Sequence, residues 1–298
     1  MPAPAPASSY EVALKNLEEL TSNEHSCSAL NPACFTQLLT HGKKVENVIV
    51  FYHGFTNCPQ QFVELGKLFF EKGYNVLIPL QPHHGELNRM NPTLPELTAE
   101  ELAAFGMQTI DIAKGLGKNV VVSGLSGGGS LTTWLAQVRD DINISMPISP
   151  FLGIRFVPRV FNRTVARILS SISGVWVWWD PIKKERNPYA DEYQYPRFPT
   201  RAVAQYMRLG YAAEQVINKK SPAGKIIVVM NDSDLSVSNK IADQFIERWE
   251  RYAGSERKQI ESYRFDKSLG LPHDIITPHR FEGNLTIVYP KLLDLLGA

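Results

Sequence analysis

The chain has 298 residues, of which 44% are hydrophobic and 20% are charged, so it resembles an ordinary globular protein with a substantial core rather than a disordered chain. With 31 Lys and Arg against 30 Asp and Glu, its formal net charge is +1. Because it also has no long basic run, we expect no nucleic-acid partner.

Residues 1–44 precede the first strong strand pattern, and we predict that they form an N-terminal extension. The first nine residues are rich in Ala and Pro and lack the charged start and apolar middle of a secretory signal. No stretch approaches the roughly 18 uninterrupted apolar residues of a membrane-spanning helix. The first nine residues are interpreted either as a disordered cytoplasmic tail, which we favour, or as the spacer of an exported protein that has lost its signal.

Three cysteines, Cys27, Cys34 and Cys58, lie in the first fifth of the chain. Any disulfide between two of them leaves one thiol over, and a local bridge is compatible with their spacing. No His or Cys cluster accompanies them at zinc spacing, so no metal site is predicted. Three inert thiols are the preferred interpretation.

From about residue 46 the sequence alternates between short apolar, β-branched runs and longer amphipathic segments, which is typical of a parallel sheet flanked by helices. The predicted strands cover residues 48–52, 74–78, 119–123, 142–148, 225–230 and 262–265. The predicted helices cover residues 60–71, 98–114, 128–138, 238–252 and 284–296, and Thr98 with Glu101 resembles a capping box. The fold class is therefore α/β, with a doubly wound and mostly parallel sheet.

Residues 151–223 interrupt this alternation. No strong strand occurs between Pro150 and Gly224, and three tryptophans accumulate there with several Tyr and Pro residues. We predict a mostly helical cap insertion over the carboxyl edge of the sheet. The core is then divided into residues 45–150 and 224–298.

Gly124-Leu125-Ser126-Gly127-Gly128 is a G-x-S-x-G motif between a predicted strand and a predicted helix. Such a turn holds its serine in a strained conformation, so the positions two before and two after it must be small. The amino terminus of the following helix favours developing negative charge. A phosphate-binding loop is the alternative, but the Lys-Ser/Thr ending of a P-loop and the order of a dinucleotide-binding motif are absent. Ser126 is therefore predicted to be a nucleophile.

Two further motifs extend this pattern: His53-Gly54-Phe55 follows the first strong strand, and Pro82-His83-His84-Gly85 follows the next. With the serine motif, they make the chain resemble the alpha/beta-hydrolase superfamily, near its branch of carboxylesterases and monoacylglycerol-lipase-like enzymes. The first is similar to that family's oxyanion loop, and the second to its P-G-H-G turn with His83 in place of Gly. We interpret these histidines as loop or hydrogen-bonding residues.

The resemblance implies the chain order serine, acid, histidine for a catalytic triad. His273 and His279 are the two histidines that follow Ser126, and His273 is favoured because its loop lies just beyond the last predicted strand. Asp232 and Asp234 compete for the role of the acid. Asp234 is favoured because Asp234-Leu235-Ser236-Val237 is similar to the family's D-x-x-V pattern.

The resemblance also assigns the oxyanion hole to the backbone N–H groups of Phe55 and Gly127, which leaves the Phe55 side chain free to line an acyl pocket. Trp176, Trp178 and Trp179 are candidate substrate-binding residues of an apolar lid, with packing of the insertion onto the sheet as the alternative. No metal or organic cofactor is needed for this chemistry.

Together these residues predict a serine hydrolase that cleaves carboxylic esters of short to medium acyl chain through an acyl-enzyme. The expected partner is a small-molecule ester. Thioesterases, peptidases and acyltransferases use the same scaffold, and a non-catalytic binding module is an alternative of a different class. The oligomeric state and the cellular compartment are left open.

Overall fold

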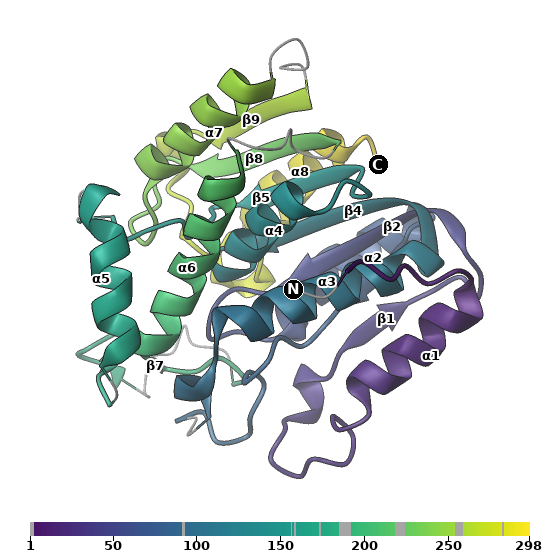
Figure 1. Cartoon of the computed structure of the whole chain (residues 1–298), viewed down its shortest axis with the longest axis horizontal. Helices are drawn as coiled ribbons and strands as arrows, with labels where there is room; N and C mark the ends of the chain where they lie inside the picture. Colours follow the sequence, from purple (N-terminus) through teal and green to yellow (C-terminus); the bar gives the residue numbers. More distant parts are fainter. Residues whose placement is uncertain are drawn as a thin grey trace.

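A seven-stranded sheet with the strand order β1-β3-β2-β4-β5-β8-β9 forms the centre of the molecule (Figure 1). The computed structural model describes residues 3–90, 93–155, 157, 159–172, 174–184, 192–217, 224–253, 259–281 and 283–298. All neighbouring strands are parallel except β1, which runs antiparallel to β3. The strands are β1 (Gln37–Leu39), β2 (Val45–Tyr52), β3 (Asn75–Ile78), β4 (Gly117–Leu125), β5 (Ile144–Ile148), β8 (Lys225–Asn231) and β9 (Ile260–Phe265).

Helices cover both faces of this sheet because its inner strands are apolar on both sides. In β2, Val48 and Val50 face one core cluster and Ile49 and Phe51 face the other. The first cluster is covered by α1 (Tyr10–Thr21), α3 (Ala99–Leu116), α4 (Gly127–Val138), α6 (Thr200–Ile217) and α7 (Asn239–Ala253). The second cluster is covered by α2 (Val63–Glu71) and α8 (Tyr289–Leu296).

The doubly wound, mostly parallel sheet predicted from the sequence is confirmed. The capping box is also present, because the Thr98 side chain accepts from the Glu101 amide and the Glu101 side chain accepts from Thr98. Small differences occur at helix ends, where a 3-10 turn (Pro59–Phe62) precedes α2 and a π-helical turn (Asn284–Val288) precedes α8.

The N-terminal segment is part of the core, which differs from the predicted extension over residues 1–44. Strand β1 adds an edge to the sheet, and α1 packs on α3 with Ala13 buried. The close approach requires Gly115, since a Cβ there would lie 2.4 Å from the Ser9 carbonyl oxygen. The interpretation of the first nine residues as a disordered tail is also wrong around Ala7, which is buried and donates its amide to the Asp111 carbonyl.

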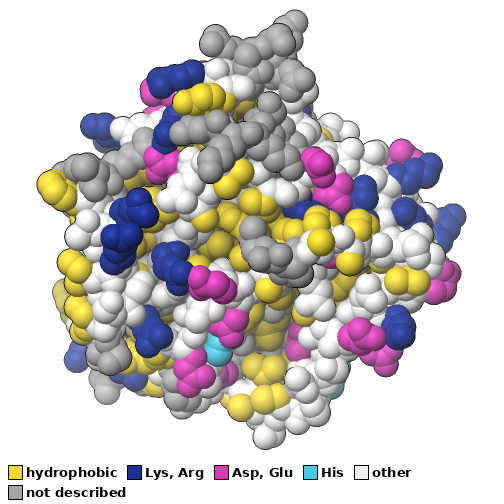
Figure 2. All heavy atoms as spheres, viewed as in Figure 1, with side chains coloured by type: hydrophobic (Ala, Val, Ile, Leu, Met, Phe, Trp, Pro, Cys, Tyr) yellow, Lys and Arg dark blue, Asp and Glu magenta, His cyan; other side chains and the backbone are white. Residues whose placement is uncertain are grey.

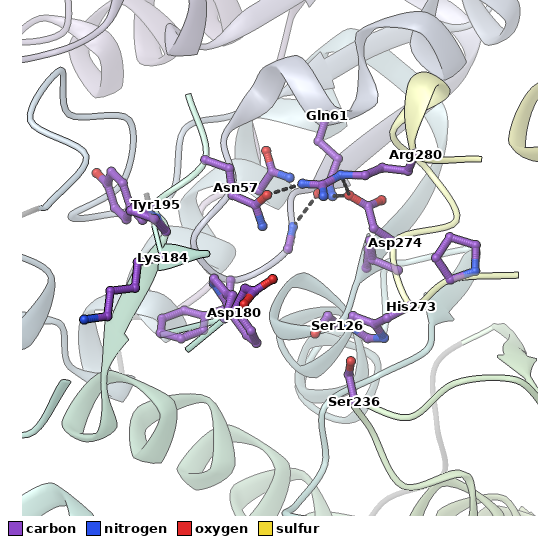
Figure 3. Close-up of a pocket in the computed structure, with 17 residues that line it drawn as sticks. Asn57, Gln61, Ser126, Asp180, Lys184, Tyr195, Ser236, His273, Asp274 and Arg280 are labelled. Carbon is purple, nitrogen blue, oxygen red and sulfur yellow. Dashed lines mark hydrogen bonds and ion pairs between the residues drawn. The ribbon is translucent and has the colours of Figure 1, made fainter. Parts of the chain in front are cut away.

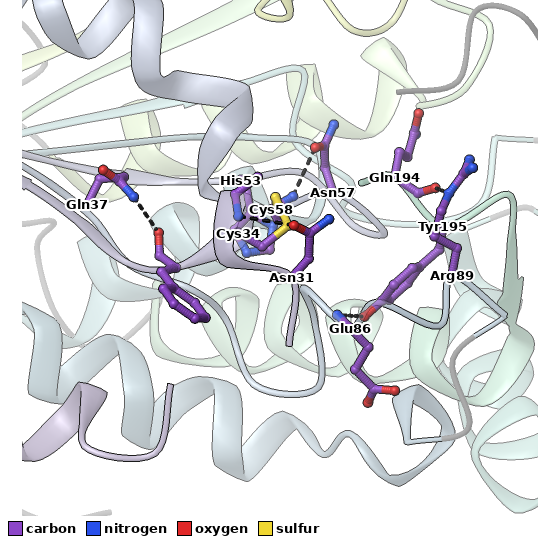
Figure 4. Close-up of a disulfide and its surroundings, with 12 residues drawn as sticks. Asn31, Cys34, Gln37, His53, Asn57, Cys58, Glu86, Arg89, Gln194 and Tyr195 are labelled. Carbon is purple, nitrogen blue, oxygen red and sulfur yellow. Dashed lines mark hydrogen bonds between the residues drawn. A yellow bond between two sulfur atoms is a disulfide. The ribbon is translucent and has the colours of Figure 1, made fainter. Parts of the chain in front are cut away.

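Cys34 and Cys58 form a disulfide, while Cys27 is free and exposed (Figure 4). The interpretation of three inert thiols is therefore wrong for two of them. The chain segment before β1 and the loop after β2 meet at the same edge of the sheet, which places the two Cα atoms 5.3 Å apart. The disulfide thus joins the N-terminal segment to the loop that follows His53.

The insertion contains α5 (Arg159–Ser171), β6 (Trp176–Trp178), β7 (Arg197–Pro199) and α6. It is mostly helical, as predicted, but β6 and β7 form an antiparallel pair that the sequence pattern did not predict. Helix α6 packs on α4, and α5 packs on α6 farther from the sheet (Figure 1). The predicted end of the insertion, at residues 218–223, lies outside the described residues.

Charged side chains of both signs share one face of the molecule. Figure 2 shows Lys and Arg side chains interspersed with Asp and Glu on the face that is turned to the viewer in Figure 1. Within the described ranges, none of the helices combines the length and the apolar character needed to cross a bilayer.

The disulfide yields a prediction about stability. It closes a segment with a sequence separation of 24, so Cys34→Ser should lower the free energy of unfolding by about 3 kcal/mol. Urea unfolding of the wild-type protein and the variant, both without reductant, measures the difference. Cys27→Ser is the matched control and should leave the unfolding midpoint unchanged. Equal midpoints for Cys34→Ser and the wild type would contradict the bridge.

Candidate active site

Ser126 occupies a strained turn between β4 and α4. Its φ and ψ are 55° and −109°, a region that residues with a side chain rarely adopt. A Cβ at Gly124 would lie 2.6 Å from the Gly128 carbonyl, and one at Gly128 would lie 2.1 Å from the Tyr52 carbonyl oxygen. The predicted need for small residues on both sides of the serine is confirmed, because any side chain there would collide with backbone.

His273 and Asp234 meet beside this turn. His273 follows β9 and Asp234 follows β8, and the imidazole Nδ1 lies 2.6 Å from the Asp234 Oδ2 atom. The other carboxylate oxygen accepts hydrogen bonds from the amides of Ser236, at 2.8 Å, and Val237, at 3.2 Å. The Asp234 side chain is fully buried, so these three donors fix it in one orientation.

The two groups shift each other's pKa. Burial alone raises the pKa of Asp234, but the hydrogen bond and charge of His273 and the two amides outweigh burial and leave this pKa below its ordinary value. Burial alone lowers the pKa of His273, but the hydrogen bond and charge of Asp234, with a smaller effect of Asp274, raise it above the ordinary 6.5. The pair therefore favours a charged carboxylate and a strongly basic imidazole.

The competing residues lie elsewhere. Asp232 forms an ion pair with Arg264, with 2.9 Å between its Oδ1 atom and the guanidinium Nη1. His279 lies in an exposed 3-10 turn (Pro278–Arg280) and lines neither of the pockets at Ser126. The structure thus brings Ser126 and His273 to the same two pockets and places Asp234 against the His273 imidazole, whereas Asp232 and His279 contact neither pocket.

The loop after β2 places the Phe55 amide next to Gly127. A Cβ at Gly127 would lie 3.2 Å from the Phe55 nitrogen, and the Gly127 amide belongs to the first turn of α4, where N–H groups lack acceptors within the helix. The loop begins at His53, which is fully buried and accepts from the Gln81 amide through Nε2, at 3.1 Å. Burial holds the pKa of His53 well below its ordinary value, so the ring is neutral.

The turn Pro82-His83-His84-Gly85 contains a residue in a rare backbone conformation. His83 has a φ of 62°, in the left-handed region that favours glycine. His84 is buried beside Phe55, and burial lowers its pKa to about 4. His84 is therefore neutral near pH 7, and neither histidine lines the pockets at Ser126.

Gln61 has a role in this site that the sequence pattern did not reveal. Its Oε1 atom accepts from the Gly54 amide at 2.7 Å, and its Nε2 atom donates to Asp274 at 3.0 Å (Figure 3). Asp274 in turn accepts from the Thr277 hydroxyl. The side chain thus links the Phe55 loop to the His273 loop.

Two pockets meet at Ser126 and His273. The first has a volume of about 240 Å³ and carries several polar side chains, and the second has a volume of about 260 Å³ and is almost wholly apolar. Polar side chains of the first pocket are Asn57, Gln61, Asp180, Lys184, Gln194, Tyr195 and Arg280 (Figure 3). Apolar side chains of the second pocket include Phe151, Ile154, Leu169, Phe198, Val203 and Val237.

Of the four residues predicted to bind substrate, Phe55 and Trp179 line both pockets, and Trp176 and Trp178 line neither. Side chains alternate along a strand, so Trp176 and Trp178 share one side of β6. There the Arg197 guanidinium lies 4.4 Å from the Trp176 ring centroid and 5.7 Å from that of Trp178. The Trp178 ring also lies 5.9 Å from the Nζ atom of Lys184, which lines the first pocket, whereas the Trp176 ring contacts Arg197.

Metal ligands do not gather at this site or at others in the described part of the chain, where no group of three or more His, Cys, Asp or Glu side chains could hold an ion.

The chain has the alpha/beta-hydrolase fold. This fold is defined by a serine turn between a strand and a helix of a mostly parallel sheet, with an acid and a histidine on later loops.

No protein-family model matches the chain. Solved structures with this fold include one reported with the metagenome-derived lipolytic enzymes LipS and LipT. It gives a TM-score of 0.67 at 19% identity, and the match covers 90% of this chain and 100% of that one. The monoacylglycerol lipase of Paleococcus ferrophilus gives a TM-score of 0.65 at 17% identity, covering 87% of this chain and 98% of that one.

Among curated proteins, the chain is similar to the thermostable monoacylglycerol lipase of Bacillus sp. (strain H-257), with 26% identity over 169 residues. This match covers 54% of the chain and spans 60% of the length of the relative. The resemblance to the branch of monoacylglycerol lipases and esterases, predicted from three motifs, is therefore confirmed.

The His273–Asp234 pair predicts an unusual titration. Histidine ring NMR of the wild-type protein should give His273 a pKa above 6.5 and His84 one of about 4. In Asp234→Asn the favourable charge is lost, so the pKa of His273 should fall while that of His84 stays in place. A His273 pKa that is the same in both proteins would contradict the pairing.

Proposed function

We propose that the chain is a serine hydrolase that cleaves carboxylic esters through an acyl-enzyme. The observation that carries this proposal is the 2.6 Å contact between Asp234 and Nδ1 of His273, a histidine that lines the same pocket as Ser126. The Ser126 backbone is held at positive φ. A buried carboxylate that orients an imidazole beside a serine is the arrangement by which a hydroxyl group becomes a nucleophile at neutral pH.

In the proposed reaction, Asp234 keeps the proton of neutral His273 on Nδ1 and leaves Nε2 as the base. His273 takes the hydroxyl proton as Ser126 Oγ attacks the ester carbonyl, and the amides of Phe55 and Gly127 donate to the oxyanion. One such donor is typically worth about 3 kcal/mol in the barrier. The imidazolium then protonates the leaving alcohol, and water activated by the same histidine hydrolyses the acyl-enzyme.

The two pockets support an ester with unlike ends. The pocket of about 260 Å³ lined by Phe151, Leu169 and Val203 offers an apolar volume for a short to medium acyl chain. The pocket lined by Asn57, Gln194 and Lys184 offers hydrogen-bonding groups for a small polar alcohol. A monoacylglycerol, the substrate class named for the Bacillus relative, has both features. A panel of acyl esters, thioesters, anilides and monoacylglycerols tests this choice directly.

The triad assignment predicts a sharp difference between two aspartates. Ser126→Ala should abolish ester hydrolysis, and Asp234→Asn should lower kcat by about 10⁴-fold because the imidazole takes the wrong tautomer. Asp232→Asn is the matched control and should lower kcat less than about threefold, since it removes only a surface ion pair. Steady-state kinetics on p-nitrophenyl acetate measures all three. A reversed order of the two aspartates, or an active Ser126→Ala, would overturn the assignment.

The acyl pocket predicts a change in chain-length preference. Val203→Phe fills part of the apolar volume, so kcat/KM for p-nitrophenyl octanoate should fall about tenfold or more relative to the acetate. Trp176→Phe, on the far side of β6, should leave the ranking of esters unchanged. If Val203→Phe preserved the ranking, the acyl chain would bind elsewhere.

A further inference from the structure

We propose that Thr56 is a positioning residue through which the cap insertion sets the oxyanion hole. The inference rests on the proposed function, because it concerns the turn that presents the Phe55 amide. Two hydrogen bonds from the cap hold Thr56 in a backbone conformation that a threonine rarely adopts.

The turn is closed by a hydrogen bond from the Asn57 amide to the Gly54 carbonyl, at 3.0 Å, with Phe55 and Thr56 as its two central residues. Thr56 has a φ of 68°. A positive φ at the second central position favours glycine or asparagine, and it is an outlier for a β-branched residue. Such a conformation persists only where the surroundings impose it.

Two residues of the cap insertion impose this backbone conformation on Thr56. The indole Nε1 of Trp179 donates to the Thr56 hydroxyl at 2.9 Å, and the Tyr195 amide donates to the Thr56 carbonyl at 2.9 Å. Thr56 is fully buried, so loss of either donor would leave a polar group without a partner in a dry site.

The cap donors are themselves fixed. The Tyr195 hydroxyl accepts from the Glu86 amide at 2.8 Å, and its ring stacks on His84 at 6.2 Å between centroids (Figure 4). The Trp179 ring packs on Phe198 at 4.3 Å. The position of the cap is therefore transmitted to Thr56 through Trp179 and Tyr195. From Thr56 it is transmitted through the turn to the Gly54–Phe55 peptide, whose carbonyl accepts from the Asn57 amide and whose N–H is the Phe55 amide.

The test uses Trp179→Phe, which keeps an aromatic ring and removes the donor, and Thr56→Val, which keeps the β-branched shape and removes the acceptor. Each of these two variants should lower kcat on p-nitrophenyl acetate about tenfold and change KM less than about twofold. This loss is smaller than the loss expected when a whole oxyanion donor is removed. The double variant should lose no more than either single variant. Trp176→Phe, whose ring contacts Arg197, is the matched control with unchanged kcat.

Rescue by glycine separates positioning from general packing. Glycine adopts a positive φ without help, so Thr56→Gly should make kcat insensitive to Trp179→Phe. Melting temperatures, measured alongside, identify any variant that is partly unfolded at the assay temperature. Additive losses, a change confined to KM, or a loss that persists in the glycine background would each overturn the role of Thr56. If the wild-type protein itself shows no hydrolysis that depends on Ser126, the proposed function fails instead.

Discussion

A serine backbone held at positive φ between β4 and α4 is the constraint on which the site depends. The sheet makes this conformation possible because glycines lie where β4, α4 and the end of β2 come closest, and any Cβ there would strike a carbonyl. The packing of β2, β4 and α4 therefore holds Ser126 in its strained backbone conformation. Because strands β2, β4, β8 and β9 are parallel, their carboxyl ends bring the Phe55 loop, Ser126, Asp234 and His273 to one edge.

The loop after β2 is fixed to the rest of the molecule at three points. Gln61 ties its start to the His273 loop, Cys58 ties its middle to the N-terminal segment, and Thr56 ties its turn to the cap. Electrostatic stabilisation of a transition state is strongest when donors are already in place, because no reorganisation is then needed.

The sequence predicted those features that are determined locally. A buried strand, a glycine-rich turn and a helix point to Ser126, and the resemblance to the alpha/beta-hydrolases limits the acid and the base to four candidates. The pairing of Cys34 with Cys58, the edge strand β1 and the link through Gln61 depend on segments far apart in the chain, so no spacing reveals them. The three tryptophans were treated as one lid, but the alternation of a short strand directs Trp176 and Trp178 away from Trp179.

The measurement that tests the account most directly is the site of covalent labelling by a fluorophosphonate, mapped by peptide mass spectrometry. The probe reacts with serines that are activated by an adjacent base. The account predicts one stoichiometric adduct on Ser126, none in Ser126→Ala and much slower labelling in Asp234→Asn. A folded wild-type protein that stays unlabelled, or that carries the adduct on another residue, would contradict it.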